Sequence, residues 1–424
     1  MIITINNTNY TKLKNLKFDP QADITGTEVI VNRFECEIIT DNNISEADTA
    51  YLYDDLNNLW AKYWITKSER HGEAVKIIAQ SALLLLNRIT MPARFYSNTS
   101  LSSALSDIFA QISAIYGTSY TIDASLSSKT ITGYAPEQSA RDRFQWICFV
   151  VGAYVKSFFS ETVDILAVDD TPSLIPLEKT FYKPKLVYGD VVTAIKVTAY
   201  SYTQGTPQTT DKWVEVNGTY YIETTQDFTL SNPDVPATAT DNIIEIKDVK
   251  LVNTVNVSEI LTRLSTYYFQ SLEVEADIVN NGEFLPGKRY YLYSDIKDMV
   301  VGYLKSATFS FGLQARSSLK FAQSQTINGK ELAIEYYYND KTLYTSRFWL
   351  PVGYIYTIET KYVDYYEDGH RYIFYPLTDE VTGTIPNADT TVRVECDIAI
   401  DFYEAKCALY NVDDIDGEEV LKIG

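Results

Sequence analysis

Short stretches in which apolar and charged residues alternate recur along this chain, and they constrain its fold more than any other feature. Residues 34–38 read Phe-Glu-Cys-Glu-Ile, and residues 272–278 read Leu-Glu-Val-Glu-Ala-Asp-Ile. A period of two residues places the apolar side chains on one face of a β-strand and the charged ones on the other. We therefore expect a mainly β protein built from half-buried strands.

Three segments break this pattern with the period of an amphipathic helix. In the clearest one, Ser100 can cap the start and Gly117 can end the helix in a left-handed conformation. The apolar residues of that helix share one face: Leu101, Ala104, Leu105, Ile108, Phe109, Ile112, Ile115 and Tyr116. A second helix is predicted from Ser139 to Gly152, and a third is predicted behind Ser258.

The rest of the chain reads as strands, turns and linkers. Trp213–Val216 and Thr219–Ile222 flank Asn217-Gly218, which is the strongest short hairpin signal. Residues 226–241 are rich in Thr, Pro, Asn and Asp and predict a long loop, and residues 323–329 predict a polar linker. Beyond the linker, strand-length runs broken by Gly, Pro and Asn predict a separate β-sandwich.

Length and charge narrow the class of protein. With 424 residues the chain is too long for one ordinary core, so two to four domains are expected. The net charge of −20 argues against nucleic-acid binding, which needs clustered Lys and Arg side chains. Solubility is the plain explanation of this charge, and a surface that repels a polyanion is the alternative. The 34 tyrosines suit strands first and protein interfaces second.

Cysteine spacing and the N-terminus indicate the compartment. Cys36, Cys148, Cys396 and Cys407 show no CxxC spacing, which favours buried free thiols in a reducing compartment. Residues 1–5 lack the charged start of a signal peptide and predict a strand. The longest apolar runs are too short to span a bilayer. We expect the chain to fold in a cytoplasm without membrane insertion.

Catalytic chemistry finds little support. His71 and His370 are the two histidines, and each follows or precedes a glycine in what reads as a solvated turn. No GxSxG, GxGxxG or GxxxxGK[ST] motif occurs, and acidic pairs such as Asp54-Asp55 and Asp169-Asp170 read as surface charge. The acidic segment 413–419 lacks calcium-loop spacing. The sequence therefore predicts no catalytic, cofactor-binding or metal-binding residues, and a chain that is not an enzyme.

The aromatic residues leave one alternative open. Tyr and Trp on strands can stack on sugars, so a β-rich adhesin or carbohydrate-binding tail protein is the alternative function. Packing of the rings within and between sheets is the competing explanation.

One stretch resembles a known family. Residues 131–136 (Ile-Thr-Gly-Tyr-Ala-Pro) lead into residues 139–154 (Ser-Ala-Arg-Asp-Arg-Phe-Gln-Trp-Ile-Cys-Phe-Val-Val-Gly-Ala-Tyr). This stretch resembles a segment of phage and prophage tail hub proteins, in which a turn containing Gly-Tyr and Pro precedes a helix ending in Gly-Ala. The preceding order is similar too: a strand at 75–80, a Ser-Ala-Leu turn, and the helix at 101–116. The resemblance is best over residues 25–170 and weaker over 185–320.

The resemblance implies a domain plan. Residues 1–100 and 155–185 would form a first tube-like β-barrel, with a helical insert at 100–154 beside it, and residues 186–325 a second such barrel. Residues 328–424 look like an Ig-like β-sandwich appended to some Gram-positive prophage proteins. The expected fold class is thus mainly β with a small helical insert (α+β).

The resemblance also implies a function: a structural baseplate hub of a phage tail, a contractile injection system or a headless bacteriocin-like particle. A homotrimer would form a ring that joins the hexameric tail tube to the trimeric spike. Expected partners are the tube, spike and other baseplate proteins, with the tape measure protein as a further candidate. DNA would be passing cargo and not a bound ligand. The expected location is the virion tail baseplate, after synthesis and assembly in the bacterial host cytoplasm.

Overall fold

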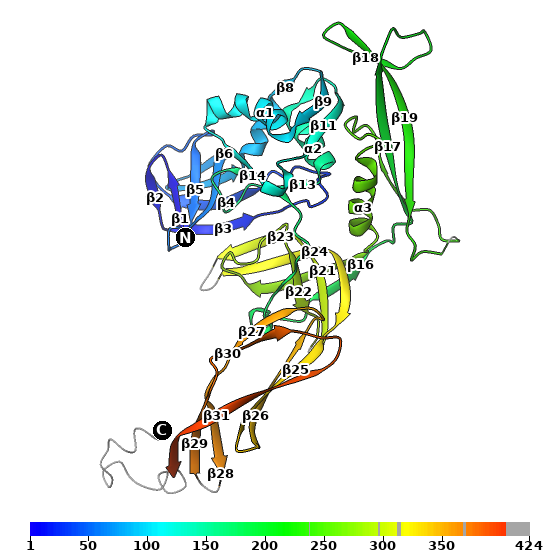
Figure 1. Cartoon of the computed structure of the whole chain (residues 1–424). Coiled ribbons are helices and arrows are strands. Elements are labelled where there is room, and N and C mark those ends of the chain that lie inside the picture. The colour runs from blue at the N-terminus through cyan, green and yellow to red at the C-terminus, as the bar shows by residue number, and fades with distance from the viewer. Residues whose placement is uncertain (237, 296, 312–314, 368–369, 404–424) are drawn as a thin grey trace. The chain divides into compact units, whose positions relative to one another are not determined.

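The computed structural model describes residues 1–236, 238–295, 297–311, 315–367 and 370–403, and all of their side chains except those of 111, 115–116 and 399–403. Two compact units divide the chain: residues 1–292 with 300–325, and residues 293–299 with 326–424. Strands are the main secondary structure of both units, and the described residues of the first unit include α1, α2 and α3 (Figure 1). The expected mainly β fold with a small helical part is confirmed.

A long mixed sheet forms the base of the first unit. Its strands follow the order β16-β21-β24-β23-β3-β4-β7-β6-β5-β1-β2, with β15 and β22 attached beside β23. The N-terminal strands are β1 (Ile2–Ile5), β2 (Thr8–Tyr10), β3 (Leu13–Asp19), β4 (Arg33–Ile39), β5 (Thr49–Tyr53), β6 (Leu59–His71) and β7 (Ala74–Gln80). The later strands are β15 (Ser173–Leu174), β16 (Lys185–Tyr188), β21 (Leu272–Val279), β22 (Arg289–Tyr293), β23 (Asp298–Phe311) and β24 (Ala315–Asn328).

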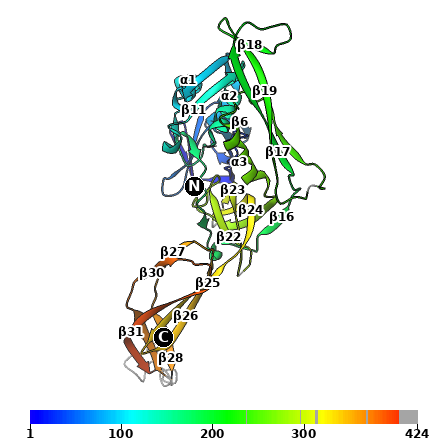
Figure 2. The same cartoon turned by 45° about the vertical axis from the view of Figure 1, so that its right-hand side comes forward.

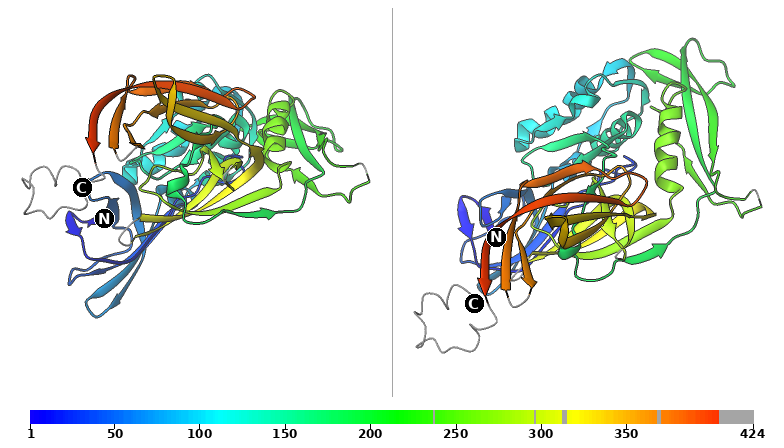
Figure 3. Two further views of the ribbon diagram at one scale, coloured as in Figure 1. Left: turned by 90° about the horizontal axis from the view of Figure 1, so that it is seen from below. Right: turned by 60° about the horizontal axis from the view of Figure 1, so that its bottom comes forward.

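The two halves of this sheet join where β3 pairs with β23. Phe18 lies opposite Phe309, and both side chains are fully buried. Trp60 packs at this junction, with its ring centroid 5.0 Å from that of Phe309 and 4.7 Å from that of Phe159. Apolar residues of both halves belong to one continuous core. Figure 3 shows the blue N-terminal strands and the yellow later strands side by side.

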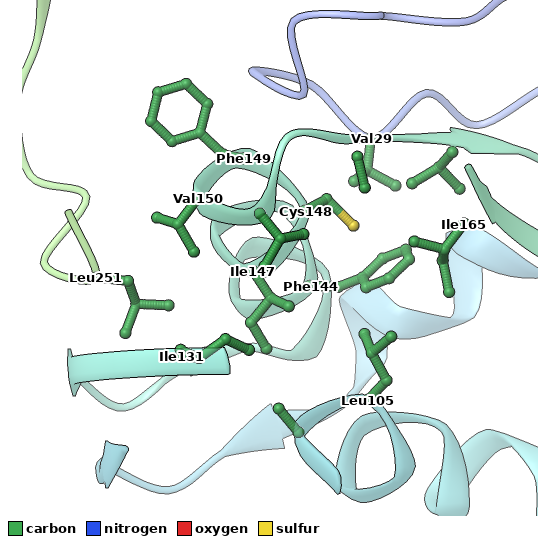
Figure 4. Packing of buried hydrophobic residues seen from close by; sticks show 14 of the residues in the cluster. Val29, Leu105, Ile131, Phe144, Ile147, Cys148, Phe149, Val150, Ile165 and Leu251 are labelled. Atoms are coloured by element: carbon green, nitrogen blue, oxygen red, sulfur yellow. The ribbon is translucent and has the colours of Figure 1, made fainter. Parts of the chain in front are cut away.

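A second core lies in a helical layer of the same unit. This layer contains η1 (Ala82–Arg88), β8 (Thr90–Met91), β9 (Arg94–Ser100), α1 (Leu101–Tyr116), β10 (Tyr120–Ile122), η2 (Ala124–Leu126), β11 (Thr130–Ala135), β12 (Gln138–Ser139), α2 (Ala140–Val151), β13 (Ala153–Lys156) and β14 (Val163–Ala167). Both helices are capped as predicted, because Ser100 and Ser139 accept backbone N–H bonds and Gly117 and Gly152 are left-handed. Figure 4 shows Phe144 of α2 directed towards Leu105 and Ile165.

A long arm of four strands is inserted between β16 and β21; β17, β18 and β19 pair antiparallel, and β20 pairs parallel with β17. The arm consists of β17 (Ala194–Gln204), β18 (Trp213–Val216), β19 (Thr219–Ser231) and β20 (Ile243–Ile246), and α3 (Val257–Tyr268) follows it. Residues of β17 and α3 share the core of the helical layer. In Figure 2 the two long strands of the arm run alongside α3. The hairpin predicted at Asn217-Gly218 is confirmed, with left-handed φ angles at both residues.

The second unit is a β-structure of its own. A five-stranded sheet has the order β26-β25-β31-β29-β28, and β27 pairs with β30. Its strands are β25 (Lys330–Tyr338), β26 (Lys341–Leu350), β27 (Ile355–Glu359), β28 (Val363–Glu367), β29 (His370–Pro376), β30 (Glu380–Thr384) and β31 (Thr390–Tyr403). The short helix η3 (Leu177–Lys179) completes the elements of the described residues, and it lies in the first unit.

Two sequence predictions about irregular segments are wrong. The loop predicted at 226–241 begins six residues too early, because β19 continues to Ser231 and pairs along its length with β17. The linker predicted at 323–329 is mostly strand, because β24 runs to Asn328. Gln323 and Ser324 are buried there, at a β-bulge opposite β21 that accommodates polar residues within a strand.

Candidate assembly surface

The polar face of the long sheet carries charges of alternating sign. Lys14 of β3 lies opposite Glu37 of β4, which lies opposite Lys76 of β7, which in turn lies opposite Glu69 of β6. We refer to these four residues as the charge ladder. Opposite charges on neighbouring strands stabilise the pairing modestly, since these side chains remain partly exposed and are screened by salt.

The same pattern continues in the other half of the sheet. The Glu275 carboxylate lies 3.1 Å from the Lys320 ammonium and 3.2 Å from that of Lys185. Hydrogen bonds from Lys320 and then Lys185 lower the pKa of Glu275. Arg316 pairs with Asp277 at 2.8 Å. Each of these acids on β21 therefore has a cation on an adjacent strand.

The main path of the long sheet has two end strands, and a branch through β22 ends at β15. β2 is the last strand on one side and pairs with β1, and β16 is the last on the other side and pairs with β21. An end strand offers backbone N–H and C=O groups to a further strand.

The chain around β16 exposes several large apolar side chains. Across the sheet, Leu186 lies opposite Val274 and Tyr188 lies opposite Leu272, and both partners are buried in the core. Leu186 and Tyr188 thus occupy the core face of the sheet, yet Tyr188 is 68% exposed. We call residues 177–191 the edge segment; its exposed apolar residues are Leu177, Phe181, Tyr182, Leu186, Tyr188 and Val191. Apolar clusters of this kind mark protein interfaces.

Comparison with known proteins identifies the fold. No protein-family model matches the sequence, and no curated protein matches it. Among solved structures, a tail protein from Neisseria meningitidis MC58 matches with a TM-score of 0.54 and 10% identity, over 76% of this chain and 95% of the other. The 43 kDa tail protein of prophage MuSo2 from Shewanella oneidensis matches with a TM-score of 0.51 and 9% identity, over 76% of this chain and 97% of the other. The chain has the fold of phage tail proteins.

This tail-protein fold confirms the resemblance inferred from residues 131–154 at the level of the fold. A third structure, the prophage tail protein gp18 from Listeria monocytogenes EGD-e, has a TM-score of 0.49 and 11% identity over 76% of this chain and 93% of the other. In the present chain, the helix predicted from Ser139 is α2 (Ala140–Val151), and it packs in the second core. The resemblance therefore rests on a buried packing element and not on a catalytic motif.

The histidines of this tail-protein fold occupy different settings. His71 is the exposed last residue of β6, before the turn at Gly72. His370 is not in a turn as predicted but begins β29, where its ring stacks on Tyr372 at a centroid distance of 5.8 Å. Strand pairing with β28 and β31 explains the difference, because it extends to His370 itself.

The acidic pairs have local roles where the structure describes them. Asp54 accepts backbone N–H bonds from Leu56 and Asn58 and so holds a turn. Asp170 accepts a hydrogen bond from the hydroxyl of Tyr303. Within the described residues, no three His, Cys, Asp or Glu side chains lie together in a way that could hold a metal ion. The acidic segment 413–419 and Cys407 lie outside the described residues.

Two further sequence expectations concern burial. Cys36, Cys148 and Cys396 are buried free thiols, as predicted. In the described part of the chain, no helix is both long enough and apolar enough to cross a membrane.

Sequence reasoning missed the edge segment altogether. The signal was present in the alternation of Leu186 and Tyr188 with Lys185 and Val187, which reads as an ordinary half-buried strand. Only the sheet order reveals that β16 is the last strand on its side, and only the structure shows that Leu186 and Tyr188 are exposed to solvent.

Proposed function

We propose that this chain is a structural subunit of a phage-type tail, in the position of the baseplate hub. In this proposal a homotrimeric ring joins the hexameric tail tube to the trimeric spike. The observation that carries the proposal is the likeness in fold to two tail proteins, over 76% of this chain and 95% and 97% of theirs. The chain is then a non-enzymatic component of the virion tail baseplate, assembled in the bacterial host cytoplasm.

The two ends of the long sheet support a ring. Residues 1–100 with 155–185 form one proposed tube-like barrel, residues 186–325 the other, and the insert at 100–154 packs beside the first. Three copies with two such domains each give a pseudo-six-fold ring that matches a hexameric tube. A contact between β16 of one copy and β2 of the next is heterologous, and repetition of a heterologous contact closes a ring when the rotation permits. The edge segment would be covered in that contact.

The charge ladder supports passage of DNA without binding. DNA phosphates are bound by uncompensated Lys and Arg, which displace condensed counterions. On the polar face of the sheet, Lys14 and Lys76 lie beside Glu37 and Glu69, so their charge is balanced locally. The net charge of −20 adds long-range repulsion. If this face lines the channel, DNA passes as cargo, and the wall is better described as balanced than as purely acidic.

The expected partners follow from the position in the tail. The tube protein would sit on one side of the ring and the spike on the other, with other baseplate proteins around it and the tape measure protein as a further candidate. The C-terminal Ig-like sandwich proposed at 328–424 is not one of the two ring-forming domains.

The test is the mass of the assembled species. In native mass spectrometry with the tube and spike proteins present, we expect a species containing three copies of this chain. Leu186→Asp combined with Tyr188→Asp should abolish it, because two buried charges would face the neighbouring copy. Ile355→Asp is the matched control, since Ile355 is 76% exposed and lies in the second unit. A chain that remains monomeric and binds neither partner would overturn the proposal.

A further inference from the structure

The second unit contains a groove that the proposed structural role does not use. The groove has a volume of about 760 Å³, which is within the range of small-molecule sites. It lies between the core-facing side of β25 and β26 and the segment 357–364. Two tyrosines, Tyr344 and Tyr362, line it and are 55% and 58% exposed.

Aromatic rings form the floor and one wall of this groove. Tyr336 is buried at the floor, and its ring centroid lies 6.1 Å from that of Tyr344. The Tyr336 hydroxyl lies near the backbone of Lys361, which belongs to the opposite wall. On that wall the Tyr362 ring lies 6.2 Å from the ring of Tyr375. Both exposed rings are therefore held by a neighbouring ring.

Polar groups surround the rings. Ser346 and Thr357 contribute hydroxyls, Glu359 and Asp364 contribute carboxylates, and Lys361 contributes an ammonium group. The Asp364 carboxylate is 3.2 Å from the guanidinium of Arg371, so its position is fixed. The lining thus combines flat apolar surfaces with hydrogen-bond donors and acceptors.

This combination selects among ligand classes. A purely apolar ligand would desolvate Glu359 and Lys361 without giving them hydrogen bonds. An anionic polymer would meet the carboxylates of Glu359 and Asp364 on a chain with a net charge of −20. A pyranose ring has an apolar C–H face that stacks on Tyr and a rim of hydroxyls that hydrogen-bond to carboxylates. We propose that this groove binds a neutral saccharide, with Tyr344 and Tyr362 as stacking platforms and Glu359 as a hydroxyl acceptor.

The experiment is a calorimetric titration of the full chain with three neutral probes: laminarihexaose, maltohexaose and chitohexaose. We expect at least one probe to bind with a dissociation constant of about 1 mM or tighter. Tyr344→Ala and Tyr362→Ala should each weaken that binding about tenfold, as loss of a stacking ring does at other aromatic platforms. Tyr344→Trp should retain it, since the platform is kept.

The control is Tyr366→Ala, because Tyr366 is 59% exposed on β28 but does not line the groove. This variant should bind the saccharide as the unaltered chain does, and circular dichroism should show that all variants are folded. No binding of any probe up to about 10 mM, or equal binding by the Tyr344 and Tyr362 variants, would overturn the proposal. Ring formation is measured separately, so failure here leaves the structural proposal standing.

Discussion

Gly133 shows how one residue joins two parts of the first unit. It lies in β11 with a φ of +137°, beside a shift in the pairing with β9. A Cβ atom at this position would lie 2.8 Å from the carbonyl oxygen of Lys250 and 3.1 Å from the Cα of Leu251. Both atoms belong to the backbone, so they cannot move aside as a flexible side chain would. Glycine is therefore required by both the φ angle and the close approach.

Gly133→Ala should destabilise the first unit by about 2–4 kcal/mol, because φ strain and a backbone clash add. Gly72→Ala is the matched control: Gly72 also has a positive φ, +64°, but nothing lies within 4 Å of its Cβ position. That control should cost about 1 kcal/mol. Urea unfolding followed by circular dichroism measures both. Equal losses in the two variants would show that the close approach contributes nothing.

Buried thiols and phenols make the free energy of unfolding depend on pH in the alkaline range. Burial raises the pKa of Cys36 and of Cys148 well above the usual thiol range. Burial likewise raises the pKa of Tyr63 and of Tyr154. At alkaline pH these groups keep their protons in the folded state and lose them in the unfolded state. Their contribution to the free energy of unfolding is therefore complete below the pKa values of the unfolded chain, and it is lost as the pH rises above those values.

The free energy of unfolding should therefore be flat from about pH 7 to about pH 8.5 and fall above about pH 9. The free energy of unfolding of the double variant Cys36→Ala, Cys148→Ala should fall less steeply between about pH 9 and pH 10, although this variant is less stable overall. Cys396 and the buried tyrosines, whose pKa values are also raised, then remain. Urea unfolding at a series of pH values measures the slope. An unchanged slope in the double variant would contradict the assignment to the thiols.

At the scale of elements, a polar network joins β17 and β19 of the arm to the segment that precedes α3. The Lys250 ammonium lies 2.7 Å from the Glu223 carboxylate, which also accepts a hydrogen bond from the Tyr202 hydroxyl at 3.1 Å. The Glu223 side chain is only 9% exposed. Nearby, Phe95 of β9 stacks on Tyr221 of β19 at a centroid distance of 4.3 Å. The network thus connects the two long strands of the arm with the segment before α3, and the ring pair places β19 against the layer.

Lys250→Met should leave the Glu223 carboxylate buried without its cation and cost about 3 kcal/mol, with faster hydrogen exchange in β17 and β19. Lys196→Met is the control on the same arm, because the Lys196–Asp227 pair at 2.8 Å is partly exposed. Its loss should cost under about 1 kcal/mol. Hydrogen exchange read by mass spectrometry distinguishes the two. Equal protection of the arm in both variants would rule out an anchoring role for Lys250.

Elements with local signals could be predicted from the sequence. Ser100 and Gly117 fixed the ends of α1, and Asn217-Gly218 placed the turn of the arm hairpin, because caps and tight turns depend on neighbouring residues. The extension of β19 to Ser231 could not be predicted, since its pairing partner β17 is distant in sequence. The polar composition of residues 323–329 predicted a linker, but pairing of β24 with β21 holds Gln323 inside a strand.

The candidate surface was harder to predict than the elements. Leu186 and Tyr188 have the pattern of a covered strand, and their exposure depends on the order of strands in the whole sheet. The same is true of the charge ladder, because its register joins four strands. Sequence therefore predicted the fold class, while the surface required the topology.

At the scale of the whole molecule, the long sheet behaves as one structural body and the second unit as another. Trp60 is 3% exposed at the β3–β23 junction and contacts rings from both halves, including Phe18 and Phe309. Because the two halves share this core, they should unfold together. The second unit has its own sheet and should unfold in a separate transition.

Differential scanning calorimetry should therefore show two transitions. Trp60→Ala should destabilise the first unit by about 3–5 kcal/mol and lower the midpoint temperature of that unit's transition only. Trp349→Ala, in β26 of the second unit, should lower only the midpoint temperature of the second unit's transition. Separate unfolding of the two halves of the long sheet would contradict the shared core.

The central claim is that three copies of this chain form a ring in a phage-type tail. Electron cryo-microscopy of the chain assembled with its cognate tube and spike proteins tests it most directly. We expect three copies of the chain in one ring between tube and spike, with the edge segment covered by the adjacent copy. A ring of any other copy number, an exposed edge segment, or absence of the chain from the tube–spike junction would contradict it.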